Sequence, residues 1–444
     1  MGFSGTDEIF GNSGDDEIQL AAGLANGGAG HDRLLLGSEG SGEIDLGAGF
    51  ARYDGGAQIS FSQFEEVYGG RAAETAWGTE AGNTIGGGWG NDSLFGFAGD
   101  DVLYGGSGNN VLDGGAGSDT IRYDDAAFMA DHVVIDLSRG LAEHYNRSSI
   151  LDGDAPTATE TDTLVSIENV VGAVSSSDVL VGNADANRLE GLGGRDRLIG
   201  RGGDDVLIGG AGNDSLEGGD GNDLYSVEDV ADIVTETNAS FAVGGIDTVQ
   251  SYLSAYTLPT NVENLRILST NGATGKGNGL KNAFQGSTGN DTLDGAGGAD
   301  TMVGGNGSDL YYVDHAGDAV SETNARLATG GNDTVYSSLA EYRLTANVEN
   351  LRLLSSGAAN GVGNNLNNTL YAGAGNNILN GGPGSDTVSY LYATSAVTVS
   401  LSKFSAQATG GSRTDTLLGI ESLTGSKHKD KLTGNGLSNT LNGE

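Results

Sequence analysis

Residues 209–226 read GGAGNDSLEGGDGNDLYS, which is two nine-residue units laid end to end. Each unit has glycine at its first, second and fourth places, aspartate at the sixth and an apolar or aromatic residue at the eighth. Glycine adopts backbone angles that a Cβ would forbid, so the first six residues suit a tight turn. The last three residues have one central apolar side chain, which suits a short strand with one inward-facing residue.

The same spacing recurs in blocks along the chain, separated by segments of different composition. The nonapeptide GGWGNDSLF begins one such block at Gly87, and GGNGSDLYY ends another at Tyr312. We divide the sequence into degenerate repeats at 1–50 and 425–444, repeat blocks at 87–122, 182–226, 277–312 and 363–389, and β-rich spacers at 51–86, 123–181, 227–276, 313–362 and 390–424.

A longer period lies on top of the nine-residue one. Residues 224–282 and 310–368 align without gaps at an offset of 86, so LYSVEDVADIVTETNA pairs with LYYVDHAGDAVSETNA. Spacer stretches such as HVVIDL and NDTVYSSL are rich in β-branched and aromatic residues, which predicts strands. The stretch FSQFEEVYG at 61–69 is the one place where we expect a short helix.

Composition limits the classes of partner. The 444 residues include 79 glycines and no cysteine, and 60 acidic against 21 basic side chains leave a net charge of −39. Such a charge repels nucleic acid and anionic lipid and favours cations. No apolar run approaches the roughly 18 residues of a membrane helix, so no membrane span is expected, and the first residues lack the pattern of an ordinary secretory signal peptide.

Stacking follows from the single apolar residue per unit. Two units would make one coil, so that Leu198, Leu207, Leu216 and Tyr225 fill a thin interior from two sides. Units two apart then lie on the same side, and their aspartates stack 18 residues apart. Stacked carboxylates repel one another unless a cation lies beside them.

Calcium is the ion that best fits these turns. It takes six to eight oxygen ligands, and a glycine-rich turn exposes carbonyl oxygens beside the carboxylate. The absence of histidine and cysteine at the repeating positions argues against zinc or copper, and magnesium demands stricter octahedral geometry. The predicted ligands are the aspartates at the sixth place of each unit: Asp7, Asp16, Asp32, Asp92, Asp101, Asp119, Asp196, Asp205, Asp214, Asp223, Asp291, Asp300, Asp309 and Asp386.

These nonapeptides resemble the RTX repeat of hemolysin-type calcium-binding proteins. The resemblance implies an all-β fold, a right-handed parallel β-roll or β-solenoid with several calcium ions between successive turns. The spacers are similar to segments of serralysin-like C-terminal regions. Asparagine replaces the sixth-place aspartate at Asn110 and Asn377, and in degenerate units at Asn83, Asn187, Asn282, Asn368 and Asn439, so those turns are weaker candidates.

The resemblance also implies a function and a location. We expect a secreted, non-catalytic calcium-binding module that leaves the cell unfolded by a type I secretion pathway and folds in extracellular calcium. Its partners would be calcium, the type I secretion machinery and a cell-surface or polysaccharide ligand. The alternatives are the repeat region of an extracellular enzyme, such as a metalloprotease, lipase or alginate epimerase, and a segment of an adhesin or surface-layer protein.

Catalytic motifs are not found in the sequence. Neither H-E-x-x-H nor G-x-S-x-G occurs, and the five histidines stand singly and are expected to be ordinary surface or loop residues. We therefore predict that the chain is not an enzyme.

Overall fold

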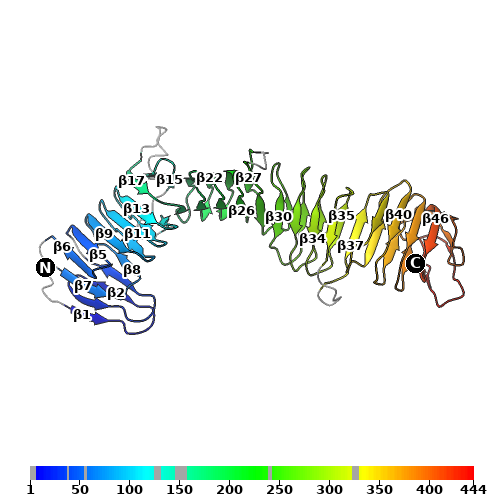
Figure 1. Ribbon diagram of the computed structural model, residues 1–444, viewed down its shortest axis with the longest axis horizontal. Coiled ribbons are helices and arrows are strands. Elements are labelled where there is room, and N and C mark those ends of the chain that lie inside the picture. Colours follow the sequence, from blue (N-terminus) through cyan, green and yellow to red (C-terminus); the bar gives the residue numbers. More distant parts are fainter. Residues whose placement is uncertain are drawn as a thin grey trace. The chain divides into compact units, whose positions relative to one another are not determined.

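The structure is a computed structural model that describes residues 7–37, 40–54, 58–124, 132–145, 158–238, 243–322 and 330–444. The chain forms two compact units, Met1–Gly245 and Ile246–Glu444. All regular elements in the described residues are β-strands, most of them three to six residues long. Figure 1 shows the strands of each unit stacked side by side.

Two long sheets form the walls of the first unit. The first has the strand order β1 (Asp7–Phe10), β3 (Gly23–Asn26), β7 (Gln58–Ser62), β6 (Phe50–Tyr53), β5 (Gly42–Asp45), β9 (Glu74–Thr79), β11 (Ser93–Ala98), β13 (Val111–Ala116), β17 (Glu160–Val165), β16 (Leu141–Tyr145), β15 (His132–Asp136), β19 (Val179–Val181), β22 (Arg197–Gly202), β25 (Ser215–Asp220) and β27 (Ile233–Thr235). The second has β2 (Glu17–Leu20), β4 (Arg33–Leu36), β8 (Glu66–Tyr68), β10 (Thr84–Gly86), β12 (Val102–Tyr104), β14 (Thr120–Arg122), β18 (Asn169–Val171), β20 (Arg188–Glu190), β23 (Val206–Ile208) and β26 (Leu224–Val227). The short strands β21 (Gly193–Gly194) and β24 (Ala211–Gly212) pair in the turns.

The second unit repeats this arrangement. One wall begins with β28 (Thr248–Ser251), β30 (Asn264–Ile267), β32 (Ala283–Gln285), β34 (Thr301–Val303) and β36 (Ala319–Ser321), and continues as β38 (Glu341–Arg343), β40 (Ala359–Val362), β42 (Asn377–Asn380), β46 (Arg413–Leu418) and β45 (Gln407–Gly410) in a separate sheet. The other wall contains β29 (Ala255–Thr257), β31 (Thr274–Lys276), β33 (Thr292–Asp294), β35 (Leu310–Val313), β37 (Thr334–Ser337), β39 (Asn350–Leu353), β41 (Thr369–Tyr371), β43 (Thr387–Ser389), β47 (Ser422–Thr424) and β49 (Thr440–Asn442). A further pair joins β44 (Thr398–Ser400) and β48 (Lys431–Thr433).

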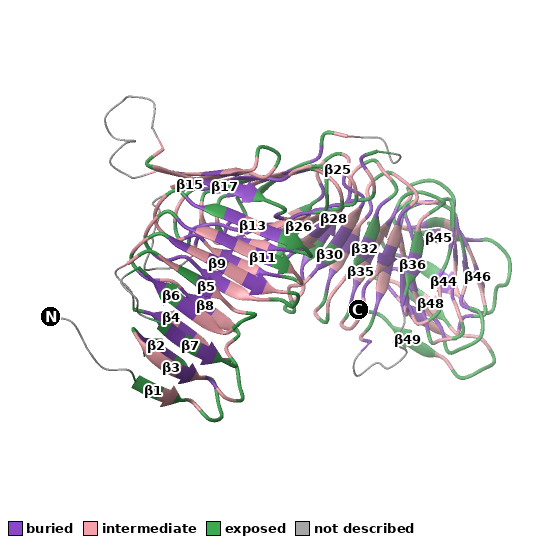
Figure 2. Cartoon of the chain, turned by 60° about the vertical axis from the view of Figure 1, so that its left-hand side comes forward, coloured by how far each residue is buried: buried purple, intermediate pink, exposed green. Residues whose placement is uncertain are grey.

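Pairing in the repeat blocks is parallel with a period of 18 residues. Leu94 in β11 lies beside Leu112 in β13, and Leu198 in β22 lies beside Leu216 in β25. Both pairs are completely buried. The strands of Figure 2 accordingly alternate between buried and more exposed residues. The prediction of two nonapeptides per coil, with one core residue each, is confirmed.

The spacers continue the coil, a question that the sequence left open. In the second unit the spacer strands β37 and β39 lie in parallel register between β35 and β41. In the first unit, β15, β16 and β17 form an antiparallel excursion, and its outer strands pair in parallel with β19 and β13. The spacers therefore add strands to the stack without ending it, with registers that differ from 18 residues, such as 24 between Leu310 and Thr334 and 16 between Thr334 and Asn350.

The predicted helix at 61–69 is wrong. This segment contains the end of β7 and all of β8, joined by a short turn in which Gln63 has a φ of 59°. Val67 is fully buried, and the side chain of Glu65 accepts the backbone N–H of Asp32 at 2.8 Å. Core burial and this cross-coil bond outweigh local helix preference.

Candidate metal centres

Carboxylates at the turns form ladders that run from coil to coil. The backbone N–H of Asp196 donates to Asp214 Oδ1 at 2.8 Å, and the N–H of Asp205 donates to Asp223 Oδ1 at 2.9 Å. The predicted 18-residue stacking of these aspartates is thus confirmed. The stacked side chains, however, are linked through the backbone, so one oxygen of each carboxylate is already occupied.

The second carboxylate oxygen is buried in most of these turns and receives no hydrogen bond. The predicted residues with such a buried Oδ2 are Asp16, Asp32, Asp92, Asp101, Asp119, Asp196, Asp205, Asp214, Asp300, Asp309 and Asp386. An ionised oxygen that loses water without gaining a partner costs several kcal/mol in principle. The turns therefore present oxygens that a cation would satisfy.

The first glycine of each unit makes room beside this oxygen. A Cβ added to Gly200 would lie 2.1 Å from Asp205 Oδ2 and 2.8 Å from the carbonyl oxygen of Gly218, one coil further on. A Cβ added to Gly96 would lie 2.2 Å from Asp101 Oδ2 and 2.6 Å from the carbonyl oxygen of Gly114. A carboxylate and a backbone carbonyl thus converge on the space that glycine leaves. This donor set fits calcium, which prefers hard oxygen ligands.

Burial shifts the ionisation of these groups. It raises the pKa of Asp205 to about 8 and that of Asp196 to about 7. It likewise raises the pKa of Asp92 and Asp101 to about 6, and backbone N–H donors oppose the shift in all four residues. Without a cation, the folded turns therefore hold protons more tightly than free aspartates do.

The other predicted ligands differ in their surroundings. Asp7 is exposed at the start of β1. Asp291 is buried, but its Oδ2 accepts the backbone N–H of Ser287 at 2.7 Å and the hydroxyl of the same residue at 3.1 Å. Asp223 is buried and takes part in the ladder from Asp205. Asp7 is thus not buried as the repeat-block carboxylates are. Asp291 has hydrogen-bond donors at both oxygens, because the backbone N–H of Ala273 donates to its Oδ1.

Two asparagines that replace the aspartate in degenerate units have hydrogen-bond partners for both the oxygen and the nitrogen of the side-chain amide. Asn187 accepts the N–H of Asn183 at 2.8 Å and donates from Nδ2 to the carbonyl of Glu168 at 2.9 Å. Asn282 likewise accepts the N–H of Asn278 and donates to two backbone carbonyls. Because both ends of these amides are hydrogen-bonded, their turns close without an ion.

Sequence reasoning missed the spacer residues that extend the ladders. Asp162 Oδ1 accepts the N–H of Asn110 at 2.8 Å, and Asp333 Oδ1 accepts the N–H of Asp309 at 2.8 Å. Glutamates also enter the ladders, since Glu168 and Glu421 accept the N–H groups of Asp119 and Asp386. The sequence did hold a signal for these residues. The spacer segments TDTL and NDTV keep the aspartate and the apolar residue of the nonapeptide but lack its glycines, and the segments IEN and IES have a glutamate in place of the aspartate.

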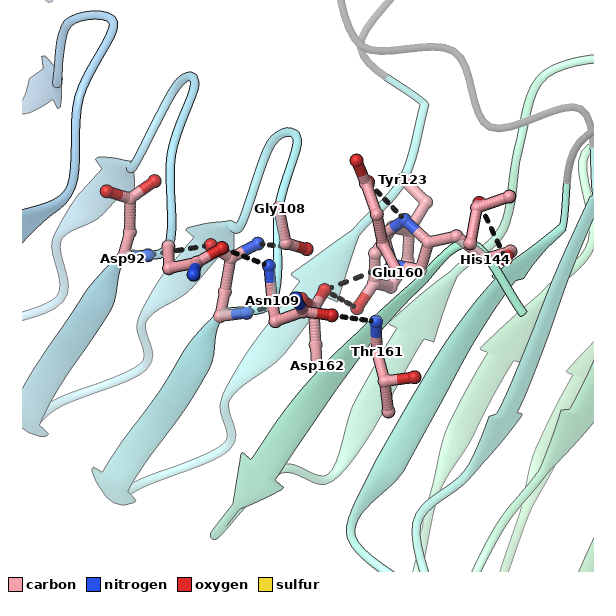
Figure 3. Close-up of polar contacts among 11 residues, drawn as sticks. Asp92, Gly108, Asn109, Tyr123, His144, Glu160, Thr161 and Asp162 are labelled. Carbon is pink, nitrogen blue, oxygen red and sulfur yellow. Dashed lines mark hydrogen bonds and ion pairs between the residues drawn. The ribbon is translucent and has the colours of Figure 1, made fainter. Parts of the chain in front are cut away.

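Asp162 shows how a spacer completes its carboxylate (Figure 3). Tyr123 donates its hydroxyl to Asp162 Oδ2 at 2.9 Å, and His144 Nε2 lies 3.1 Å from the same oxygen. Glu160 Oε2 is 3.6 Å from the other ring nitrogen of His144. His144 is only 5 % exposed, so the expectation that all five histidines lie on the surface or in loops is wrong for this residue.

Comparison with known families agrees with the geometry. The family model for the RTX calcium-binding nonapeptide repeat, which spans four copies, matches residues 1–23, 68–96, 95–125, 173–207, 199–234, 277–311 and 362–390. No curated protein matches the chain. Among the described residues, no helix is long and apolar enough to cross a membrane.

Proposed function

Because the chain is a β-roll protein built on RTX calcium-binding repeats, we propose that calcium binding drives its folding and that the folded protein acts without catalysis outside the cell. The observation that carries this proposal is the row of buried carboxylate oxygens without hydrogen-bond donors in the repeat blocks. In a chain with a net charge of −39, a bound cation would both reduce the charge and give these carboxylate oxygens the partner that they lack.

The energetics favour a switch. At neutral pH the carboxylates of an unfolded chain are ionised and hydrated, whereas folding without calcium would bury them unpaired or protonated. Extracellular calcium modules bind with dissociation constants of about 10⁻⁴–10⁻³ M. The chain would then stay unfolded in a calcium-poor cytosol, pass through a type I secretion channel and fold outside. Export and location rest on the resemblance to secreted RTX proteins.

The non-catalytic role is supported by the environment of the buried His144–Asp162 pair. This pair is enclosed in the ladder and bonded to Tyr123, and Asp162 also accepts the N–H of Asn110. These contacts give the pair a structural task within the coil.

The test is far-UV circular dichroism of the purified chain during calcium titration, with magnesium at the same concentrations as the control. We expect a cooperative gain of β-structure with calcium and little change with magnesium. An identical, fully folded spectrum in chelator would contradict calcium-driven folding.

A further inference from the structure

A second kind of carboxylate cluster lies where the spacer of the second unit joins the preceding repeat block. Asp309 ends the ladder of that block, Glu322 follows β36, and Asp333 precedes β37. One ligand oxygen of each residue lies within 4.8 Å of those of the other two. Asp309 and Asp333 are each 1 % exposed and Glu322 is 6 % exposed.

Each carboxylate already has one hydrogen-bonded oxygen. Asp309 Oδ1 accepts the N–H of Asp291, and Asp333 Oδ1 accepts the N–H of Asp309, both at 2.8 Å. Glu322 Oε1 accepts the hydroxyl of Tyr311. The remaining oxygens Asp309 Oδ2 and Glu322 Oε2 are buried and receive no hydrogen bond. Two ionisable oxygens therefore face a buried cluster without a donor.

Gly304 leaves a space at this cluster. A Cβ on Gly304 would lie 2.2 Å from Asp309 Oδ2, 2.6 Å from Glu322 Oε1 and 2.1 Å from the Tyr311 hydroxyl. Three oxygens from different parts of the chain thus converge there. In the described part of the second unit, the salt bridge found joins Lys276 to Asp294 and does not reach the cluster.

We propose that Asp309, Glu322 and Asp333 form a divalent-cation site in which the spacer supplies a glutamate ligand, unlike the glycine-turn sites of the repeats. The proposal rests on the proposed function in taking calcium as the resident ion, since three carboxylates and a nearby phenol form an all-oxygen donor set. The sequence of the first copy has Asp223, Glu236 and Asp247 at the positions 86 residues earlier.

Such a site would fasten the spacer to the block. Glu322 lies eleven residues beyond Tyr311, and its carboxylate turns back against the last repeat carboxylate. An ion held there would link Asp309 and Asp333, which precede the paired strands β35 and β37 of two neighbouring coils, through Glu322 in the chain between them. Calcium binding by the block would thereby order the spacer as well.

Tyr311 provides an optical probe, because a tyrosine beside bound terbium sensitises its emission. The full-length chain would be titrated with Tb³⁺ under tyrosine excitation, with Glu322→Gln, Tyr311→Phe and the double variant compared. Glutamine retains an oxygen that can accept the Tyr311 hydroxyl but removes the charge. Glu341→Gln, which removes an exposed carboxylate from β38, is the matched control.

The expected result is an equal loss of emission in Glu322→Gln and Tyr311→Phe, with no further loss in the double variant and none in Glu341→Gln. In the wild-type chain, added calcium should displace terbium and abolish the Tyr311-dependent emission, because both ions take oxygen ligands. Wild-type emission in Glu322→Gln, or additive losses, would overturn the proposal.

Two controls separate this inference from the proposed function. Circular dichroism in saturating calcium would verify that each variant folds; if Glu322→Gln does not, unchanged emission in Tyr311→Phe alone overturns the site. Calcium-dependent folding with emission independent of Glu322 refutes the site and leaves the proposed function standing. Glu322-dependent emission in a chain that folds without calcium refutes the proposed function and supports the site.

Discussion

Asp196 and Asp162 occupy equivalent places in the ladders of the first unit but differ in the partners of their second carboxylate oxygen. Each accepts a backbone N–H of the preceding coil through Oδ1. Asp196 Oδ2 has no donor, whereas Asp162 Oδ2 is bound by Tyr123 and His144. The second carboxylate oxygen thus has no hydrogen-bond donor in the repeat block, whereas in the spacer the corresponding oxygen is bound by spacer side chains.

The difference lies in what surrounds the second oxygen. In the block, Gly191 leaves space beside Asp196, since a Cβ there would lie 2.4 Å from Oδ2. In the second unit, the spacer carboxylate Asp415 resembles Asp162, because Thr409 donates its hydroxyl to Asp415 Oδ2 at 3.2 Å. Continuous backbone ladders therefore hold the coils together, while glycine or a donor side chain decides whether an ion is needed.

The largest expected effect is that, without calcium, the free energy of unfolding falls as the pH rises. Burial raises the pKa of Asp196 to about 7 and of Asp205 to about 8 in the calcium-free fold. Between the ordinary aspartate pKa and these values, the folded state binds more protons than the unfolded state, so its free energy of unfolding falls as pH rises. We expect the chain in chelator to hold β-structure at pH 5, where these carboxylates are protonated, and to lose it by pH 8, where folding would bury them ionised.

With saturating calcium the dependence should reverse, because calcium binds the ionised carboxylates and competes with protons. Thermal unfolding followed by circular dichroism at both pH values, with and without calcium, checks this. β-Structure in chelator that increases as the pH rises would show that the block carboxylates are already paired.

A second prediction fills the space beside one block carboxylate. Gly209→Ala would place a Cβ 2.4 Å from Asp214 Oδ2 and should cost about 1–3 kcal/mol through overpacking. It should also weaken the response to calcium. Gly297→Ala is the control, since its Cβ would meet nothing within 4 Å. Equal stability of the two variants in denaturant titrations would argue against a tight site at Asp214.

A third prediction concerns the hydrogen bond between His144 and Asp162 in the spacer. His144→Phe removes one donor from the buried Asp162 and should cost about 1–2 kcal/mol of unfolding free energy. Because Asp162 needs no ion, the loss should be the same at every calcium concentration at which both chains are folded. A loss that grows as the calcium concentration rises would place an ion beside Asp162.

The smallest effect concerns the second place of the nonapeptide. Phe97 stands there with a φ of 79° and is half exposed. Phe97→Gly should stabilise the chain by about 0.5–1 kcal/mol, because glycine adopts this left-handed conformation without a Cβ penalty. A destabilised variant in a denaturant titration would show that the ring makes contacts worth more than the strain.

The repeat blocks were predictable from sequence because their pattern is local. The glycine spacing requires turns, and one apolar residue per unit requires stacking, so the 18-residue register of Leu198 and Leu216 follows directly. The stacking of the aspartates follows from the same register. The match of the RTX family model agrees with this part of the interpretation.

The spacers were harder to predict because their ladder partners come from separated positions. Asp162 reaches Asn110 across 52 residues of sequence, and Glu421 reaches Asp386 across 35. The burial of His144 depends on the antiparallel excursion of β15–β17, which no local pattern reveals. The helix expected at 61–69 failed for the same reason, since Glu65 bonds a residue 33 positions earlier.

The most direct test of this account is a crystal structure of the full chain grown in calcium, with anomalous scattering used to locate the ions. The account predicts calcium about 2.3–2.6 Å from Oδ2 of block aspartates such as Asp101, Asp196 and Asp205, and no ion at Asp162. Block carboxylates without ions, or calcium bound at Asp162 in place of His144, would contradict it.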